Sequence, residues 1–159
     1  MHLIEAENIR KNYRVGDVEV PALKGVSFEI GEGAFAAFVG PSGSGKSTLL
    51  NLIGCLDHPS SGALRVNGVD ISSLSRSAAA TFRGEHLGFI FQDFNLVPVL
   101  SAYENIEYPL LMVRGWSPEK RRERVKQMIA AVDMTDHAHK RPDQLSGGQK
   151  QRVAVARAL

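Results

Sequence analysis

The chain has 159 residues, 43% of them hydrophobic and 23% charged, which is the composition of one folded domain and excludes a disordered chain. The 19 basic and 17 acidic residues give a net charge of +2, so we expect no nucleic-acid partner, because nucleic-acid binders carry a strongly basic face. A single cysteine excludes an internal disulfide and a cysteine-based zinc site. The sequence has neither a signal-peptide pattern nor an apolar run of ~20 residues, and we therefore expect a soluble, intracellular chain.

The first 70 residues alternate short apolar runs with turn residues, which predicts strands. Val26–Ile30 alternates with period 2, as a half-buried strand does, whereas Ala34–Val39 is apolar on both faces, as is typical of a central strand covered on two sides. Ala63–Val66 is a further expected strand, which the turn residues Asn67 and Gly68 close.

Helices are expected between these strands. Lys46–Gly54 is predicted to be a helix that ends at its glycine, and Arg76–Arg83 a shorter helix. Leu87–Phe91 is expected to be a second buried strand. This alternation predicts an α/β fold with a parallel sheet and right-handed crossovers.

From about Ser101 onward the pattern becomes helical. Ser117 and Pro118 are the N-cap and first-turn residues of a helix that we expect to reach Asp133. One face of that helix is basic, and it is either a solvated face or a patch for an anion or a partner. The other face is an apolar stripe for packing, made of Val125, Met128, Ile129 and Val132.

The segment GPSGSGKST fits the phosphate-loop pattern G-x-x-x-x-G-K-[ST], with an expected strand before it and an expected helix after it. Glycines let successive backbone N–H groups point at a phosphate, and the following helix N-terminus adds partial positive charge. Lys46 supplies a full charge for the β- and γ-phosphates, and the Ser47 hydroxyl is a ligand for Mg²⁺. The segment therefore predicts a nucleoside triphosphate site made of Gly40, Pro41, Ser42, Gly43, Ser44, Gly45, Lys46, Ser47 and Thr48.

A second glycine motif, LSGGQ, precedes an expected helix over Gln149–Leu159. Ser146 and Gln149 have the S-x-x-Q spacing of a capping box. Gly147 and Gly148 leave backbone N–H groups bare at the helix start, which is again suited to a phosphate. On local chemistry alone, a plain helix cap is the simpler interpretation.

Downstream of a phosphate loop, LSGGQ resembles the signature of the ATP-binding cassette (ABC) ATPases, and the resemblance runs the length of the chain. The segment FIFQ, which ends at Gln92, lies where this family has its glutamine loop. Tyr13 is similar in place to the aromatic residue that stacks on adenine, with a core or edge-strand tyrosine as the alternative. The segments that resemble the lipoprotein-releasing and macrolide-export subgroup are Leu49–Asp57, Gly88–Leu96 and Gln144–Leu159.

For the fold, the resemblance implies a P-loop NTPase with a central, mainly parallel sheet, an N-terminal antiparallel β subdomain and a helical subdomain that carries the signature. Residues 1–92 would hold the first two parts and residues 93–159 the helical part, with the cassette incomplete at its C-terminus. Cys55 is expected to be a small buried residue behind the phosphate loop.

For the site, the resemblance implies a head-to-tail dimer with a second ATP-binding subunit. ATP would lie between the phosphate loop of one subunit and Ser146, Gly147, Gly148 and Gln149 of the other. Gln92 and Lys46 would be the catalytic residues, and Ser47 and Gln92 would contact Mg²⁺. The region around residues 101–115 would face an integral membrane permease, at the inner face of the cell membrane.

Three hydrolytic residues of the family have no match in the sequence: the strand-end acid, the catalytic glutamate and the switch histidine. Asp93 follows an apolar run, but Gln92 beside it fits the glutamine loop better. We therefore expect the N-terminal part of a longer cassette that binds ATP, with negligible ATPase activity and poor stability by itself.

The function that the sequence predicts is that of an ATP-binding subunit of an ABC transporter, which couples ATP binding and hydrolysis to export or lipoprotein release by permease partners. A non-transport cassette with a mechanical or regulatory role is an alternative, as is a non-catalytic nucleotide-binding fragment. A P-loop kinase or GTPase is disfavoured because those proteins lack LSGGQ.

Overall fold

The computed structural model describes residues 2–112 and 116–159. The chain divides into two compact units, residues 1–83 and 84–159, and each is described by itself. This division lies before the one near residue 92 that the sequence suggested. Helix α2 (Arg76–His86) runs across it, and contains the shorter helix expected at Arg76–Arg83.

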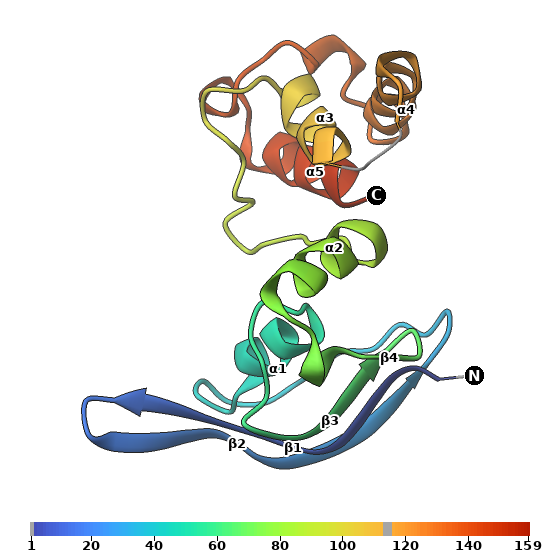
Figure 1. Cartoon of the computed structure of the whole chain (residues 1–159). Helices are drawn as coiled ribbons and strands as arrows, with labels where there is room; N and C mark the ends of the chain where they lie inside the picture. Colours follow the sequence, from blue (N-terminus) through green and yellow to red (C-terminus); the bar gives the residue numbers. More distant parts are fainter. Residues whose placement is uncertain (1, 113–115) are drawn as a thin grey trace. The chain divides into compact units, whose positions relative to one another are not determined.

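Unit 1 is built on an antiparallel sheet whose strand order is β2-β1-β3-β4 (Figure 1). β1 (His2–Val15) pairs with β2 (Val18–Gly31) on one edge and with β3 (Ser61–Val66) on the other. These strands contain the expected Val26–Ile30 and Ala63–Val66 and extend beyond both.

The turn that follows β3 has the geometry its sequence predicts. Asn67 and Gly68 have φ values of 51° and 73°, as the two central residues of a type I′ hairpin turn require. They bring β4 (Val69–Asp70) back beside β3, and η1 (Ile71–Ser73) follows directly.

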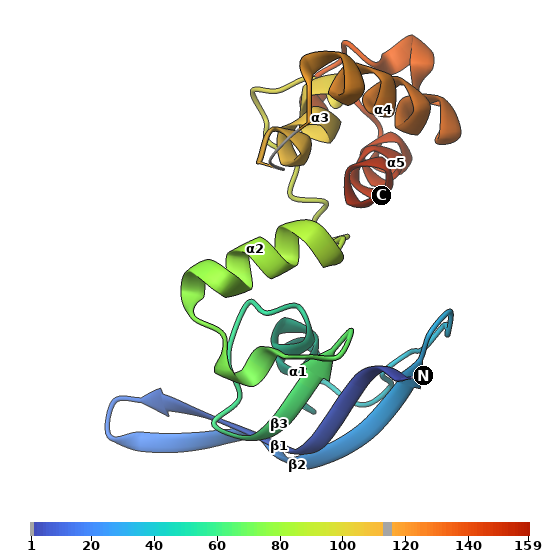
Figure 2. The ribbon, with the colours of Figure 1, turned by 45° about the vertical axis from the view of Figure 1, so that its right-hand side comes forward.

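Helix α1 (Lys46–Ile53) lies on one face of the sheet (Figures 1 and 2) and ends at Gly54, as expected. Its buried residues, Leu49 and Leu52, join a core to which the sheet contributes Ile9 and Leu64, all of them at most 5% exposed. Removing this apolar surface from water is what holds a short helix that would not be stable alone.

Cys55, just after α1, is 4% exposed and has a free thiol, which confirms the expected buried residue. Burial raises the pKa of this thiol, while the Arg83 guanidinium acts in the opposite direction. Arg83 also donates a hydrogen bond of 2.6 Å to the Cys55 carbonyl, so α2 is tied to the segment that follows α1.

Two segments that the sequence predicts to be buried strands are not strands. Ala34–Val39 has no strand assignment, and its Phe35 and Val39 are 102% and 93% exposed. Leu87–Phe91 has none either, and its Ile90 is 56% exposed. An apolar run indicates a tendency to be buried, but a strand forms only where a partner backbone accepts and donates its hydrogen bonds. Between the described strands every pairing is antiparallel, so the predicted parallel sheet with right-handed crossovers is not found among them.

Unit 2 is helical, and its three main helices pack on one another: α3 (Ala102–Met112), α4 (Pro118–Ala131) and α5 (Gly147–Ala158). The short turns η2 (Thr135–His137) and η3 (Pro142–Gln144) connect α4 to α5. Ser117 caps α4 by accepting a hydrogen bond of 3.2 Å from the Lys120 N–H, as predicted. The shared core also confirms the expected apolar stripe of α4, and its buried members are Ala102, Ile106, Val125, Ile129, Met134, Ala138, Leu145, Val153 and Ala156.

One polar side chain, Asn105 of α3, is buried in unit 2 at 1% exposure. Its Oδ1 accepts a hydrogen bond of 2.7 Å from the Val97 N–H, and its Nδ2 donates to the carbonyls of Val97, Leu100 and Ser101. Satisfied buried amides fix the backbone around them. Asn105 therefore holds the segment that leads into α3.

Within residues 2–112 and 116–159, no helix has the length and apolar character needed to cross a membrane.

The close approach of β3 to β1 at Gly62 gives a test of the fold. A Cβ on Gly62 of β3 would lie 2.5 Å from the Asn8 carbonyl oxygen and 2.6 Å from that of Glu7, at a φ of +93°. Gly68 has a φ of +73° but open space around it. We expect Gly62→Ala to lower the free energy of unfolding by about 1–3 kcal/mol more than Gly68→Ala does, because only the first adds a backbone clash to the strain. Urea denaturation followed by circular dichroism measures both, and equal losses would contradict the contact.

Candidate nucleotide-binding site

The phosphate loop, residues 40–48, leads from an exposed segment into α1. Gly43 and Gly45 have φ values of 79° and 90°, which glycine adopts at no steric cost. The Ser44 N–H donates to the Pro41 carbonyl at 3.3 Å, and Gly45 is the N-cap of α1. Pro41, Ser42, Gly43 and Ser44 are exposed, as is Ser47 in the first turn of the helix, while Thr48 is half-buried.

The Lys46 side chain folds back over the loop. Its Nζ donates hydrogen bonds to the carbonyls of Gly40 and Pro41 at 2.9 and 2.8 Å, and to the Ser44 hydroxyl at 3.3 Å. The ammonium therefore lies within the curve of the loop, where a phosphate group would meet it together with the backbone N–H groups at the helix N-terminus.

Close backbone contacts fix the loop against the sheet. A Cβ on Gly45 would lie 2.7 Å from the Ala22 carbonyl oxygen and 2.8 Å from Leu23 Cδ2, both in β2. A Cβ on Gly40 would lie 2.9 Å from the Ser44 Oγ. Glycine at position 45 is thus needed both for its positive φ and for this approach, which sets where α1 begins.

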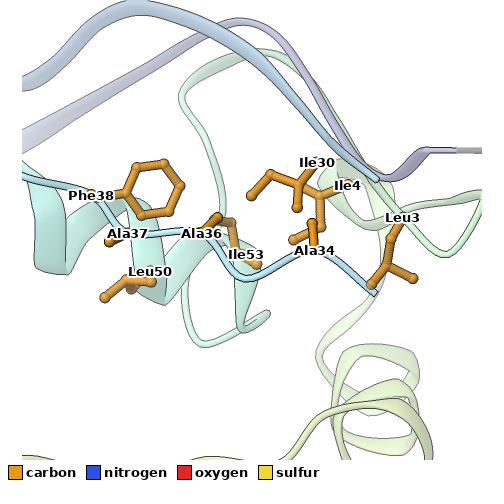
Figure 3. Close-up of a pocket in the computed structure, with 9 residues that line it drawn as sticks. All are labelled: Leu3, Ile4, Ile30, Ala34, Ala36, Ala37, Phe38, Leu50 and Ile53. Atoms are coloured by element: carbon orange, nitrogen blue, oxygen red, sulfur yellow. The ribbon is translucent and has the colours of Figure 1, made fainter. Parts of the chain in front are cut away.

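The segment just before the loop lines an apolar cavity of about 430 Å³ in unit 1 (Figure 3). The side chains that line it come from this segment, from α1 and from the ends of β1 and β2, and Figure 3 shows them as carbon only. Because they offer no hydrogen-bond donor, the cavity is unsuited to phosphate. Its residues are Leu3, Ile4, Ile30, Ala34, Ala36, Ala37, Phe38, Leu50 and Ile53.

Tyr13 lies on β1, in the same unit as the phosphate loop, and is 38% exposed. Its hydroxyl donates a hydrogen bond of 3.0 Å to Asp57 Oδ2. The Lys11 ammonium lies over the ring at 5.0 Å from the centroid and donates a 2.6 Å bond to Asp57 Oδ1. Burial acts to raise the pKa of Asp57, but hydrogen bonds from Lys11, the His58 N–H and Tyr13 outweigh it and the pKa is lowered.

The second glycine motif begins α5 in unit 2, and the predicted capping box is confirmed. The Ser146 Oγ accepts from the Gln149 N–H at 3.3 Å, and Gln149 Oε1 accepts from the Ser146 N–H at 2.9 Å. The helix starts at Gly147, two residues earlier than expected. Ser146, Gly147 and Gly148 are exposed, and a Cβ on either glycine would meet nothing within 4 Å.

Gln92 lies in an exposed turn of unit 2, and the residues after it are tied to α5. Arg157 Nη2 donates to the Phe94 carbonyl at 2.7 Å, and Nη1 donates to the Asn95 carbonyl at 2.6 Å. Phe94 and Asn95 both have positive φ, 59° and 46°, which is a strained conformation for residues other than glycine. Partial burial lowers the pKa of the Arg157 guanidinium, which nevertheless stays charged at neutral pH.

The structure therefore brings the predicted residues together in two groups, one in each unit. Unit 1 holds Tyr13 and the phosphate loop, and unit 2 holds Gln92 and the LSGGQ motif. Among residues 2–112 and 116–159, no three His, Cys, Asp or Glu side chains are grouped as a metal site would need. Of the two expected Mg²⁺ contacts, Ser47 lies in unit 1 and Gln92 in unit 2.

The sequence analysis predicted no role for three residues that contact these groups: Lys11, Asp57 and Arg157. Lys11 and Asp57 are 46 positions apart, so no local pattern joins them. Asp57 and Arg157 do lie in the segments that resemble the export subgroup, and that was the one signal that could have singled them out.

Comparison with known proteins shows the family to which the chain belongs. The profile of the family described as ABC transporter matches residues 23–159, and the chain belongs to that family. Its structure matches two dimeric solved structures of the cassette MJ0796, one of them bound to ADP and Pi, each with a TM-score of 0.89. They are 44% and 45% identical to this chain, and the match covers 98% of this chain and 68% of the solved chain. The expected α/β cassette fold is thereby confirmed.

The curated relatives include exporters. The macrolide export ATP-binding/permease protein MacB of Syntrophobacter fumaroxidans is 47% identical over 160 residues, which cover 100% of this chain and 22% of that protein. An uncharacterized ABC transporter ATP-binding protein of Thermotoga maritima is 46% identical over 99% of this chain and 67% of its own length. The chain thus spans about a quarter or less of the length of the MacB relatives, and the resemblance to the macrolide-export subgroup is confirmed.

The contact of Arg157 with the residues after Gln92 gives a measurable expectation. We expect Arg157→Met to speed amide hydrogen exchange in residues 92–97 by about tenfold or more, because it removes two hydrogen bonds from a charged donor. Arg152→Met is the matched control, since the bond from Arg152 to the Val132 carbonyl is long, 3.4 Å, and lies away from this turn. Equal exchange in the two variants would show that Arg157 does not hold this turn.

Proposed function

We propose that the chain binds ATP with Mg²⁺ through residues 40–48 and serves as the ATP-binding part of an ABC transporter. The observation that carries this proposal is the phosphate loop itself, in which Lys46 lies inside a curve of backbone that begins a helix. Lys46 would contact the β- and γ-phosphates, and Ser47 would hold Mg²⁺.

The two groups of site residues support a head-to-tail dimer. The start of α5 is exposed and unobstructed at Gly147 and Gly148, so its N–H groups are accessible to a nucleotide held by a second copy. In the proposed dimer Ser146, Gly147, Gly148 and Gln149 contact the ATP that lies on the partner's phosphate loop. The dimeric form of the MJ0796 cassettes is in keeping with this arrangement.

Gln92 would contact Mg²⁺ and the attacking water in the complete ATPase. None of the 159 residues matches the family's catalytic glutamate or switch histidine. We therefore propose that these 159 residues alone hold ATP with negligible turnover, since phosphoryl transfer needs a residue that orients the water and an acid that holds the metal.

The nucleotide-binding proposal is tested by Lys46→Met. We expect the dissociation constant for ATP, measured by titration calorimetry with Mg²⁺, to rise about tenfold to a hundredfold, because the phosphates lose a charged hydrogen-bond donor. Lys24→Met, at an exposed position of β2 outside the loop, is the control and should change the constant less than twofold. An unchanged affinity in Lys46→Met would refute the assignment.

The transport proposal concerns the partner. The MacB relatives are named ATP-binding/permease proteins, and exposed apolar side chains on α3 (Tyr108, Leu111 and Met112) offer a surface of the kind that a permease would cover. We propose a permease for export or lipoprotein release, and a place on the inner face of the cell membrane.

Purification of the chain from membranes of its own cells tests this. We expect a permease to co-purify with the chain, and fewer copies of it with a variant that carries Leu111→Glu and Met112→Glu. Recovery only in soluble complexes with ribosomes or DNA would instead favour a non-transport cassette.

A further inference from the structure

Three side chains of unit 1 outside the phosphate loop form a connected polar network. Asp57, after α1, accepts hydrogen bonds from two residues of β1: from Tyr13 Oη at 3.0 Å and from Lys11 Nζ at 2.6 Å. Lys11 also donates to the His58 carbonyl at 2.7 Å, and Asp57 Oδ1 accepts from the His58 N–H at 2.7 Å. The Lys11 side chain is only 12% exposed and that of Asp57 30%, so the pair is shielded from water on most sides.

The network ties the far end of α1 to the same strands that hold its near end. Gly45, before the helix, rests against Ala22 and Leu23 of β2, and Leu23 is the register partner of Lys11 in β1. Asp57, beyond the helix, is bonded to Lys11 itself. The helix is thus fixed at both ends on neighbouring positions of the hairpin, and Tyr13 has a defined position relative to the phosphate loop.

The Tyr13 ring is constrained in two ways. The hydrogen bond to Asp57 fixes the phenol oxygen, and the Lys11 ammonium lies over the ring at 5.0 Å from its centroid. The exposed part of the residue, 38%, is left for a flat partner. An aromatic ring held in place can stack on a base without first losing the rotational freedom of its own side chain.

We propose that Asp57 and Lys11 are positioning residues that hold the Tyr13 ring for stacking on the purine base of the nucleotide whose phosphates the loop binds. The inference rests on the proposed function and on the expected stacking of Tyr13 on the base, and it adds the two residues that position the ring. Asp57 acts through Tyr13 and does not touch the nucleotide. Base and phosphates are then held by two separable parts of unit 1, one on β1 and one at the start of α1.

The experiment compares two ligands, ATP and inorganic tripolyphosphate, by calorimetry with Mg²⁺. Tripolyphosphate reports on the phosphate loop alone, and ATP reports on the loop and the base together. We expect Asp57→Asn to weaken ATP about threefold to tenfold and to change tripolyphosphate less than twofold, because the amide does not supply the charge that holds Lys11 and the phenol.

Two further variants make the test independent of the fold around α1. Tyr13→Phe removes the same hydrogen bond from the other side, without altering Asp57 or its bonds to Lys11 and the His58 N–H, and should reproduce the ATP-selective loss. Asp17→Asn removes a carboxylate from the turn of the same hairpin, where it is fully exposed, and should leave both affinities unchanged. In a Tyr13→Ala background, Asp57→Asn should have no further effect on ATP.

Each outcome decides between the proposals. If Asp57→Asn weakens both ligands equally, or neither, Asp57 only anchors α1 or has no role in binding, and the inference is wrong while the proposed function stands. If the wild-type chain binds neither ligand, or binds both independently of Lys46, the proposed function fails and the inference fails with it.

Discussion

Strand β1 forms backbone hydrogen bonds with β2 on one edge and with β3 on the other, and the arrangement of unit 1 depends on these two pairings. The pairing is irregular near Asn8, where the strand bends and β3 passes so close that only glycine fits at position 62. A second irregularity lies opposite Lys11 and Asn12, where Ala22 is an extra residue in β2. Gly45 rests on that bulge, so an interruption in the ladder sets the start of the phosphate-loop helix.

Unit 2 depends in the same way on a single helix. α5 packs against both α3 and α4, so its position is fixed by the core of the unit. At its start it presents exposed glycines beyond a capping box, and at its end Arg157 holds the turn that follows Gln92. A Cβ on Gly88 would clash with the Ala158 carbonyl oxygen, so the chain before Gln92 also lies against this helix end. Both expected functional segments of the unit are therefore held by one rigid element.

The sequence predicts those parts whose cause is local. The caps at Ser117 and Ser146, the end of α1 at Gly54 and the turn at Asn67 and Gly68 each follow from residues within a few positions of one another. The prediction of strands at residues 34–39 and 87–91 was wrong, because strand pairing depends on a neighbouring backbone that an apolar pattern does not specify. The Lys11–Asp57 and Arg157–Phe94 contacts join residues 46 and 63 positions apart, and nothing in either stretch marks its partner.

The contacts of Lys46 have a consequence for how a ligand enters. Within residues 40–48 it is the one charged side chain, and it serves as an internal cross-link between the two arms of the loop. In the proposed complex, phosphate oxygens would replace the Gly40 and Pro41 carbonyls as acceptors around this ammonium. The two carbonyls would thus give up their hydrogen bonds to the ligand, and the loop, already cross-linked by Lys46, would lose little conformational entropy on binding.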